Sequence, residues 1–328
     1  MEQILGIGNA LVDVVTLIDN DNILEKFNLP KGSMQLVDSA KSEMVKAGTE
    51  NFNRSFTSGG SAANTIHGLA MVGIKTGFIG SIGKDDLGDF FENEMKNAGI
   101  YTILSRRDSV TGTAVALISP DSERTFATHL GAAVELNVND LVPENFQGYD
   151  ILYMEGYLII NRPLVEKACM LAKEKKMKIA IDLASYNVVE AKLDDFKEIV
   201  EKYVDIVFAN EEEAKSFTGM GTEEALNHIS KFCEIVIIKA GSEGSFVKRG
   251  EEIIKIGTDK VNVKDTTGAG DLYAAGFLFG YANGMDIEKC GILGSLMAGK
   301  VIEIIGARMN ESKFEEIRAA IKTIVEQE

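Results

Sequence analysis

Short apolar runs alternate along the chain with amphipathic stretches of helical period. The apolar runs are rich in β-branched residues and nearly uninterrupted, which is typical of parallel strands that are buried on both faces. They are Ile4–Gly8, Thr76–Ile79, Ile151–Met154, Ile179–Asp182, Ile206–Phe208 and Ile235–Ile238. The helical patterns that follow them include Ala62–Val72, Leu87–Ala98, Leu164–Lys175, Glu211–Phe217 and Glu223–Phe232, and Ala269–Tyr281, Glu288–Ile304 and Lys313–Val325 end the chain. The alternation predicts an α/β fold with a doubly wound, mainly parallel sheet flanked by helices.

Two regions interrupt this rhythm with strand patterns that have no helix between them. They are Leu11–Ile18 with Met34–Val37, and Thr102–Arg107 with Thr113–Ile118 and Arg124–His129. A small β-sheet that emerges from an α/β body near its ligand crevice is expected to act as a lid. Periodicity leaves open the alternative of a decorated edge of the main sheet. The expected division is an α/β core of residues 1–10, 40–100 and 131–328 and a small β lid of residues 11–39 and 101–130.

Composition excludes some classes of function. The chain has 328 residues, of which 45% are apolar and 26% charged, so a large buried core is affordable. The net charge is −16 and no run is rich in Lys or Arg, which argues against a nucleic-acid partner. In so acidic a protein, a site for a phosphorylated ligand must be made locally positive by helix ends, backbone N–H groups or a metal.

Cysteine and histidine usage favours a reducing cytoplasm. Cys169, Cys233 and Cys290 are far apart and form no CxxC pair, and there are only three histidines, so a zinc site is not expected. No apolar run approaches the ~18 residues of a membrane span. The first residues carry Glu2 instead of the basic residues of a signal peptide. We therefore expect a cytoplasmic protein without a membrane partner.

The strongest chemical signal is a glycine-rich turn, Asp265–Asp271 (Asp-Thr-Thr-Gly-Ala-Gly-Asp), which opens directly into an apolar helix. Gly268 and Gly270 carry no side chains, so backbone N–H groups can approach a ligand closely. These groups lie at a helix N-terminus, which favours negative charge and suits a phosphoryl group in transfer. Asp271 could accept a proton from an attacking hydroxyl. The structural alternative is that Asp271 only complements the helix dipole.

This turn resembles the second signature of the ribokinase-like carbohydrate kinases, the PfkB family. A first signature is also present, in Ser58-Gly59-Gly60-Ser61-Ala62-Ala63-Asn64 followed by Gly80–Gly88. The resemblance covers essentially the whole chain and implies a kinase that uses ATP and Mg²⁺. It is far less specific for the substrate.

The resemblance implies a role for each matching position on the acceptor side. The catalytic base would be Asp271, with anion-hole amides from Gly268, Ala269 and Gly270. The sugar hydroxyls would be held by Gly59, Gly60 and Asn64, and an adjacent pair of hydroxyls by Asp13. A carboxylate suits a diol because it offers two acceptor oxygens to two donors. Without the resemblance, Asp13 reads as an exposed strand residue and Gly59-Gly60 as a loop before a helix.

The resemblance also implies a donor side. Asn210 and Glu213 match a motif that helps to place Mg²⁺ and phosphates, with Glu213 acting through water; the alternative is an acidic first helical turn. A loop that would meet the ATP phosphates is formed by Lys239, Gly241, Ser242 and Gly244, and reads by itself as a tight turn. A monovalent cation such as K⁺ is expected near Asp265.

Within the family the chain is most similar to the bacterial adenosine kinase-like branch. Gly6–Asp13, Leu29–Leu36 and Asp121–Phe126 carry this similarity. It implies that Gln35 lies near the base and that Arg124 approaches the phosphate from the lid. Tyr157 would contact the base by stacking, or would serve only in core packing.

The predicted function is phosphorylation of the 5′-hydroxyl of a ribose-containing substrate, most simply a nucleoside such as adenosine. The alternatives are a kinase for a free sugar such as ribose or fructose, and a non-catalytic sugar or nucleoside sensor. A dinucleotide-binding oxidoreductase is disfavoured because Leu11 occupies the third glycine position of the fingerprint that begins at Gly6. The oligomeric state, monomer or homodimer, stays open.

Overall fold

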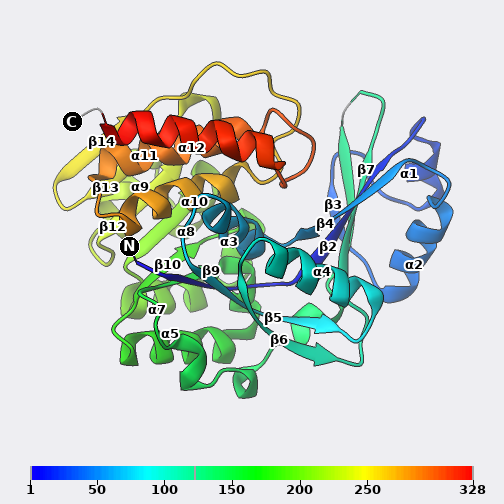
Figure 1. The fold of residues 1–328 in the computed structure, drawn as a ribbon, viewed down its shortest axis with the longest axis horizontal. Helices are drawn as coiled ribbons and strands as arrows, with labels where there is room; N and C mark the ends of the chain where they lie inside the picture. The colour runs from blue at the N-terminus through cyan, green and yellow to red at the C-terminus, as the bar shows by residue number, and fades with distance from the viewer. Residues whose placement is uncertain (1, 122, 327–328) are drawn as a thin grey trace.

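The computed structural model describes residues 2–121 and 123–326 and contains two β-sheets. The larger sheet has nine strands in the order β14-β13-β12-β11-β10-β9-β1-β5-β6, and the smaller has five in the order β3-β8-β7-β2-β4. Figure 1 shows the large sheet between layers of helices and the small sheet projecting to one side. The predicted doubly wound α/β fold with a second, smaller sheet is confirmed.

Every strand predicted from an apolar run belongs to the large sheet. Its strands are β1 (Ile4–Ile7), β5 (Thr76–Gly83), β6 (Tyr101–Arg107), β9 (Ile151–Glu155), β10 (Lys178–Asp182), β11 (Ile206–Asn210), β12 (Ile235–Lys239), β13 (Ser245–Arg249) and β14 (Glu252–Ile256). Within this sheet, β12, β11, β10, β9, β1, β5 and β6 run parallel to one another. Strands β13 and β14 extend the edge beyond β12 as an antiparallel meander.

Helices cover both faces of the large sheet. One face packs against α3 (Ser61–Met71), α4 (Asp86–Asn97), α10 (Ala269–Ala282), α11 (Ile287–Val301) and α12 (Glu311–Glu326), and the other against α5 (Arg162–Glu174), α7 (Leu193–Tyr203), α8 (Glu211–Thr218) and α9 (Thr222–Ile229). Successive strand residues enter opposite cores: Ile4 belongs to the first and Leu5 to the second. Because both faces are buried, the strands need apolar residues at every position, which explains the uninterrupted runs.

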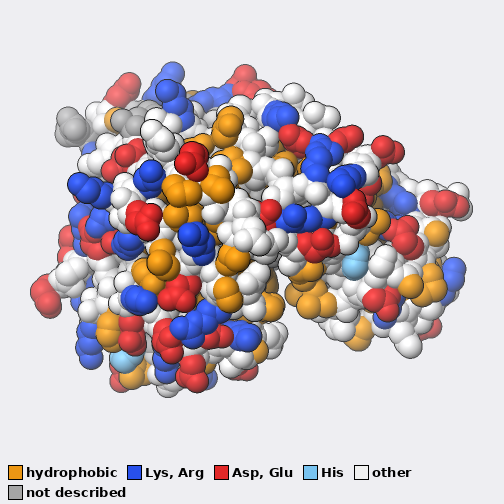
Figure 2. All heavy atoms as spheres, turned by 90° about the horizontal axis from the view of Figure 1, so that it is seen from below, with side chains coloured by type: hydrophobic (Ala, Val, Ile, Leu, Met, Phe, Trp, Pro, Cys, Tyr) orange, Lys and Arg blue, Asp and Glu red, His pale blue; other side chains and the backbone are white. Residues whose placement is uncertain are grey.

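The smaller unit consists of a five-stranded sheet with helices on one face only. Its strands are β2 (Leu11–Leu17), β3 (Met34–Leu36), β4 (Arg54–Gly59), β7 (Gly112–Ile118) and β8 (Arg124–His129), and its helices are α1 (Asn22–Lys26) and α2 (Ser39–Gly48). A small core that includes Val14, Val115 and Leu24 fills the space between sheet and helices. Figure 2 shows this unit as a smaller lobe, set off from the main body by an indentation.

The boundary of the small unit differs from the sequence-based division in three places. Residues 101–107, expected in the lid, form β6 and pair with β5 in the large sheet. Strand β4 and helix α2, expected in the core, belong to the small unit because β4 pairs with β2 and α2 covers the sheet. Helix α1 lies between two strands that were expected to have no helix between them. Strand β4 (Arg-Ser-Phe-Thr-Ser-Gly) is mostly polar, so periodicity gives no signal for it.

Among the helices of residues 2–121 and 123–326, none combines the length and the apolarity that crossing a membrane requires.

Candidate active site

Polar residues mark the carboxyl ends of five neighbouring parallel strands. They are Asn9 just after β1, Glu155 on β9, Asp182 on β10, Asn210 on β11 and Lys239 on β12. Parallel strands end at the same edge of the sheet, so these side chains share one rim. Strands β5 and β6 extend the sheet on the β1 side, and β10 to β14 extend it on the β9 side, so the strand order reverses between β1 and β9. Ligands of open α/β sheets bind at such a switch point.

The Asp271 carboxylate lies where the N-terminal turns of α10 and α3 meet. Ser61 Oγ donates a hydrogen bond to Asp271 Oδ1 at 2.8 Å, and Asn64 Nδ2 donates to Oδ2 at 3.0 Å. Burial raises the pKa of Asp271 to about 6, against the opposing effect of these two hydrogen bonds. The carboxylate is therefore oriented from both sides and mostly ionised at neutral pH, as a general base must be.

The glycine turn before α10 has the geometry of an anion site. Gly268 has φ 78°, and a Cβ there would lie 2.6 Å from the Cβ of Ala307, so only glycine fits. The first-turn amides, including that of Gly270, have no carbonyl one turn back to receive them. Ala269 differs from the expectation, because its N–H donates to the carbonyl of Thr266 at 3.2 Å. The amides left for a ligand are mainly those of Gly268 and Gly270.

A lysine brings positive charge to this turn. Lys239 Nζ lies 2.7 Å from Asp182 Oδ2, and a Cβ on Gly270 would lie 3.1 Å from the same Nζ. Burial alone would lower the pKa of Lys239, but the facing carboxylates of Asp182 and Glu213 raise it overall. The ammonium group is thus held charged beside the anion site of an otherwise acidic crevice.

Asn210 and Glu213 form a reciprocal cap at the start of α8. The amide and side chain of Asn210 donate to the two carboxylate oxygens of Glu213 at 2.8 Å each, and Glu213 N donates back to Asn210 Oδ1 at 2.8 Å. Burial, with Asp182 nearby, raises the pKa of Glu213 to about 7. Each carboxylate oxygen keeps a second lone pair, so a water-mediated contact to Mg²⁺ remains compatible with the cap.

Asp13 of β2 brings a carboxylate from the small sheet close enough to interact with the carboxylate of Asp271. A Cβ on Gly59 of the neighbouring strand would lie 2.2 Å from Asp13 Oδ1, so Gly59 makes room for the carboxylate. Gly60 has φ 101°, and a Cβ there would lie 2.0 Å from the backbone oxygen of Asn9. Burial raises the pKa of Asp13 to about 7, with Arg308 acting in the opposite direction. The two glycines are thus required by close approach, and one of them serves Asp13 directly.

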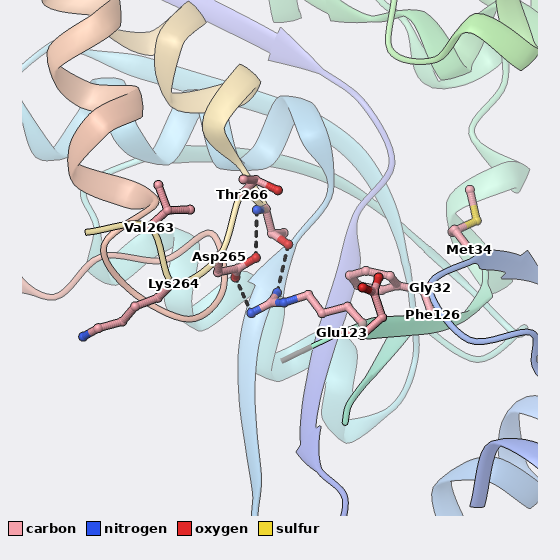
Figure 3. A pocket seen from close by; sticks show the side chains of 10 residues that line it. Gly32, Met34, Glu123, Phe126, Val263, Lys264, Asp265 and Thr266 are labelled. Atoms are coloured by element: carbon pink, nitrogen blue, oxygen red, sulfur yellow. Dashed lines mark hydrogen bonds and ion pairs between the residues drawn. The ribbon is translucent and has the colours of Figure 1, made fainter. Parts of the chain in front are cut away.

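Arg124 of β8 reaches across to the glycine turn. Its guanidinium pairs with the Asp265 carboxylate and donates to Thr267 Oγ1 at 2.9 Å. These groups line a cavity of about 470 Å³ between the small sheet and residues 263–267. In Figure 3, Asp265 faces the lid side chains while Lys264 points away from them. Arg124 thus ties the small sheet to the glycine turn.

The Asp265 carboxylate is already satisfied. Besides Arg124, it accepts hydrogen bonds from Thr267 N at 2.9 Å and from Gly306 N. A monovalent cation in this neighbourhood would therefore need other ligands, such as backbone carbonyls, since the carboxylate has its cationic partner.

Strand register decides which lid residues face the crevice. Asp13 pairs with Ala114, Ala114 with Thr128, and Thr128 with Leu36, so all four share one face, and alternation adds Met34 to it. Gln35 pairs with Ala127, which belongs to the small core under the helices. Gln35 instead donates to Ser33 Oγ at 3.2 Å. Gln35 therefore lies on the helix-covered face of the small sheet, whereas Met34 and Leu36 lie on the face that bears Asp13; a contact between Gln35 and a base stays a prediction.

Tyr157 and Glu155 lie at the floor of the crevice. The Tyr157 hydroxyl donates to Ala184 O at 3.4 Å, and burial raises its pKa, as do neighbouring carboxylates. Glu155 accepts hydrogen bonds from Asn9 N and Ala62 N, both at 3.0 Å, and so ties β9 to the turn after β1 and to the start of α3. The Tyr157 hydroxyl is thus bonded to the backbone after β10, and Glu155 holds the backbone at Asn9 and Ala62.

The loop after β12 carries Gly241, Ser242 and Gly244, which were expected to meet the ATP phosphates. Gly244 has φ 93°, and a Cβ there would lie 1.9 Å from Ile256 O, so its glycine has a structural reason. The side chain of Thr258 donates to Ser242 O at 3.1 Å. Gly241 has open space around its Cα and φ 54°. The contact between Thr258 and Ser242 places the loop beside a second cavity of about 360 Å³, because Thr258 also lines that cavity.

Sequence reasoning missed three residues of the site. Ser61 orients the Asp271 carboxylate, Asp182 pairs with Lys239, and Glu155 fixes the turn after β1. Asp182 and Glu155 each end a buried apolar strand, and an acid at that position is the signal that could have identified them. Ser61 stands inside the first signature, but only the tertiary structure brings it to Asp271.

Known proteins resemble this chain in sequence and in fold. Residues 34–313 match the family described as "pfkB family carbohydrate kinase". The structure of the adenosine kinase from Sinorhizobium meliloti superposes with a TM-score of 0.88 at 34% identity, over 97% of this chain and 99% of that one.

Two further relatives carry sugar kinase names. An uncharacterized sugar kinase from Archaeoglobus fulgidus is 30% identical over 247 residues, covering 74% of this chain and 96% of the relative. The 5-dehydro-2-deoxygluconokinase from Bacillus subtilis is 29% identical over 260 residues, covering 74% of this chain and 80% of the relative. The relatives therefore agree on a kinase and differ in the substrate.

Proposed function

The chain belongs to the pfkB family of carbohydrate kinases, and on that premise we propose that it transfers the γ-phosphoryl group of ATP to the 5′-hydroxyl of a nucleoside such as adenosine. The family membership gives the kinase activity. The choice of a nucleoside as acceptor rests on the lid, and on similarity to a kinase that is named for adenosine.

The observation that carries the proposal is the apolar crevice-facing side of the lid. Met34 and Leu36 are 51% and 64% exposed on the face that also bears Asp13, and Phe126 lies beside Met34 across the β3–β8 pair. A nucleoside presents a diol at one end and a flat, largely apolar base at the other. The diol suits the two oxygens of Asp13, and the base suits an apolar wall. A free sugar has hydroxyls all round and would leave several of them unpaired against this wall.

Asp271 would act as the general base. Its carboxylate, held by Ser61 and Asn64, takes the proton of the 5′-hydroxyl as the oxygen attacks the γ-phosphorus in line. Asn64 Oδ1 is buried without a hydrogen-bond partner among the described residues. A hydroxyl group of the substrate that receives the phosphoryl group would donate a hydrogen bond to it. The proton thus moves to a group that is already oriented and whose pKa of about 6 keeps it ionised at neutral pH.

The donor side would stabilise the charge on the transferred group. The Gly268 and Gly270 amides and the Lys239 ammonium meet the phosphoryl oxygens. Mg²⁺ supplies further positive charge when it is bound, and Glu213 would contact it through water. Within residues 2–121 and 123–326 no group of three or more His, Cys, Asp or Glu side chains is arranged to hold a metal, so phosphate and water oxygens would supply most of its ligands.

The second cavity would receive the base of ATP. Its walls include Ile256, Ile292, Leu296 and Ile324, and Ser295 Oγ donates to Gly257 O at 2.8 Å at its edge. Lys255, Asp259 and Glu288 also line the cavity, so apolar walls for a flat ring stand beside polar groups for its edge. The Thr258–Ser242 contact joins this cavity to the loop that also carries Gly241.

The test is ADP release in a coupled assay with adenosine, inosine, ribose, fructose and their phosphates, with the position of the new phosphate read by ³¹P NMR. We expect turnover with a nucleoside and a 5′-phosphate product. Turnover with ribose or fructose and none with nucleosides would establish the free-sugar alternative. Nucleoside binding without ADP release would indicate a sensor. Equal rates in potassium and in tetramethylammonium would argue against activation by K⁺.

A further inference from the structure

The segment Gly306–Arg308, between α11 and α12, touches both glycine turns of the site. We call residues 265–270 the phosphoryl-side turn and residues 58–60 the acceptor-side turn. Gly306 N donates to the Asp265 carboxylate, and the side chain of Ala307 lies against Gly268, where a Cβ would come within 2.6 Å. These two contacts hold the phosphoryl-side turn. The next residue, Arg308, reaches the acceptor-side turn.

Arg308 fixes the residue that precedes the Gly59–Gly60 turn. Its Nε donates to the backbone oxygen of Ser58 at 2.7 Å, across 250 positions of sequence. On the other side, the N–H of Ser58 donates to the Glu94 carboxylate of α4. Both backbone groups of Ser58 are thus held by side chains from other elements, and these side chains carry opposite charges. The following residue, Gly59, is the one that packs against the Asp13 carboxylate.

The charge of Arg308 also faces the site. Burial lowers its pKa to about 10, so it remains protonated at neutral pH, and the carboxylates that face it are Glu94, Asp13 and Asp271. Nη2 contacts Met95 Sδ at 3.9 Å, while Nη1 is buried with no hydrogen-bond partner in the part of the chain that the structure describes. His67 of α3 is the other titratable neighbour; its pKa is lowered by burial and by Arg308, so it is neutral.

We infer that Arg308 is a positioning residue for the acceptor sugar: it holds the Ser58–Gly60 turn against Asp13 and places a fixed cation behind that carboxylate. The inference rests on the proposed function only for the identity of the acceptor. A cation that cannot form all its hydrogen bonds is costly to bury. Such a cation is expected where it lowers the pKa of a buried binding carboxylate and holds the neighbouring turn in place.

The chain offers a matched control in Arg318 of α12. Arg318 Nη1 donates to Met71 O at 2.8 Å across 247 positions, so it makes the same kind of long-range bond at the opposite end of α3 from the site. We compare Arg308→Met, Arg308→Lys and Arg318→Met. Arg308→Met is expected to raise the KM for adenosine about tenfold or more, because a hydrogen bond from a charged group and its support of Asp13 are lost. The KM for ATP should change less than about twofold. Lys should restore part of the effect through its charge, without the planar geometry.

Two readouts separate this role from a general loss of stability. In Arg308→Met the acid limb of kcat/KM should move to higher pH, because Asp13 loses the cation that opposes its raised pKa. Hydrogen exchange of residues 54–66 should be faster in Arg308→Met than in Arg318→Met without any substrate. Equal KM values and pH profiles in the two Met variants would overturn the inference.

The hydrogen-exchange measurement stands apart from catalysis. If the wild type phosphorylates neither nucleosides nor sugars, the proposed function fails. The inference is then decided by exchange alone: faster exchange at residues 54–66 in Arg308→Met supports it, and exchange equal to that of Arg318→Met overturns it.

Discussion

The two sheets of this protein differ in how their faces are covered. The nine-stranded sheet has helices on both faces, and all eight residues of β5 are buried. The five-stranded sheet has helices on one face, and its other face leaves Met34 and Leu36 more than half exposed. The first sheet supplies stability and a rim on which polar side chains are fixed. The second leaves apolar surface uncovered, a surface that a ligand can bury.

The sharpest test of this division is at the N-terminal turn of α10, which packs on the large sheet. Asp271→Asn should lower kcat by about 10²–10⁴-fold, since an amide cannot accept the proton. Thermal stability should stay near that of the wild type, because the amide keeps the size of the carboxylate and one of its acceptor oxygens. Single-turnover kinetics and a melting curve measure the two effects. A kcat within about threefold of the wild type would show that Asp271 is not the base.

The second test contrasts one apolar residue from each sheet. Phe208 of β11 is fully buried and packs edge-on against Phe277 with ring centroids 5.6 Å apart, so Phe208→Ala should cost about 3–5 kcal/mol of unfolding free energy. Leu36→Ala on the lid should cost less than about 0.5 kcal/mol, as for an exposed side chain. Urea unfolding of both variants provides the comparison. A large loss of stability for Leu36→Ala would mean that the lid face is covered in solution.

The third test concerns the acceptor site on the lid. Asp13→Asn keeps one acceptor oxygen and replaces the other with a donor, so kcat/KM for the nucleoside should fall about 10–100-fold, with little change in the KM for ATP. Asp19→Asn, at an exposed position shortly after the same strand, is the control and should leave both values unchanged. If both substrates lost affinity alike, Asp13 would serve the lid as a whole and not the acceptor alone.

The smallest expected effect is the dependence of stability on pH. The folded-state pKa values of Asp13, Glu155 and Glu213 are raised to about 7 and that of Asp271 to about 6, in each case mainly by burial. These groups bind protons in the folded protein at a pH where the unfolded chain has released them, so their contribution to stability is lost as pH rises through 6 to 7.

The free protein should therefore have a higher melting temperature at pH 6 than at pH 8. Activity, which needs ionised Asp271, should be lower at pH 6 than at pH 8. Asp13→Asn should flatten the stability curve. A melting temperature that rises from pH 6 to pH 8 would contradict the raised pKa values.

The sequence by itself determined the six parallel strands β1, β5, β9, β10, β11 and β12 of the large sheet and the position of the glycine turn before α10. Uninterrupted apolar runs and helical periods are local signals, and a parallel sheet buried on both faces requires them. The Asp265–Asp271 turn is likewise local, since a glycine turn and the helix after it lie in one stretch of chain. Strand β4 and helix α2 of the small unit were assigned to the wrong part, because β4 is placed there by its pairing with β2 and α2 by its packing on the small sheet.

Only the tertiary structure decided which side chains meet. Ser61 and Asp271 are 210 positions apart, and Arg308 and Ser58 are 250 apart, so no local pattern records their contacts. The orientation of the lid residues was also undecided, because a shift of one position in register turns Gln35 toward the crevice and Met34 away from it. Register is fixed by burial of Val14, Val115 and Ala127 under the helices, a property of the packed molecule and not of any single segment.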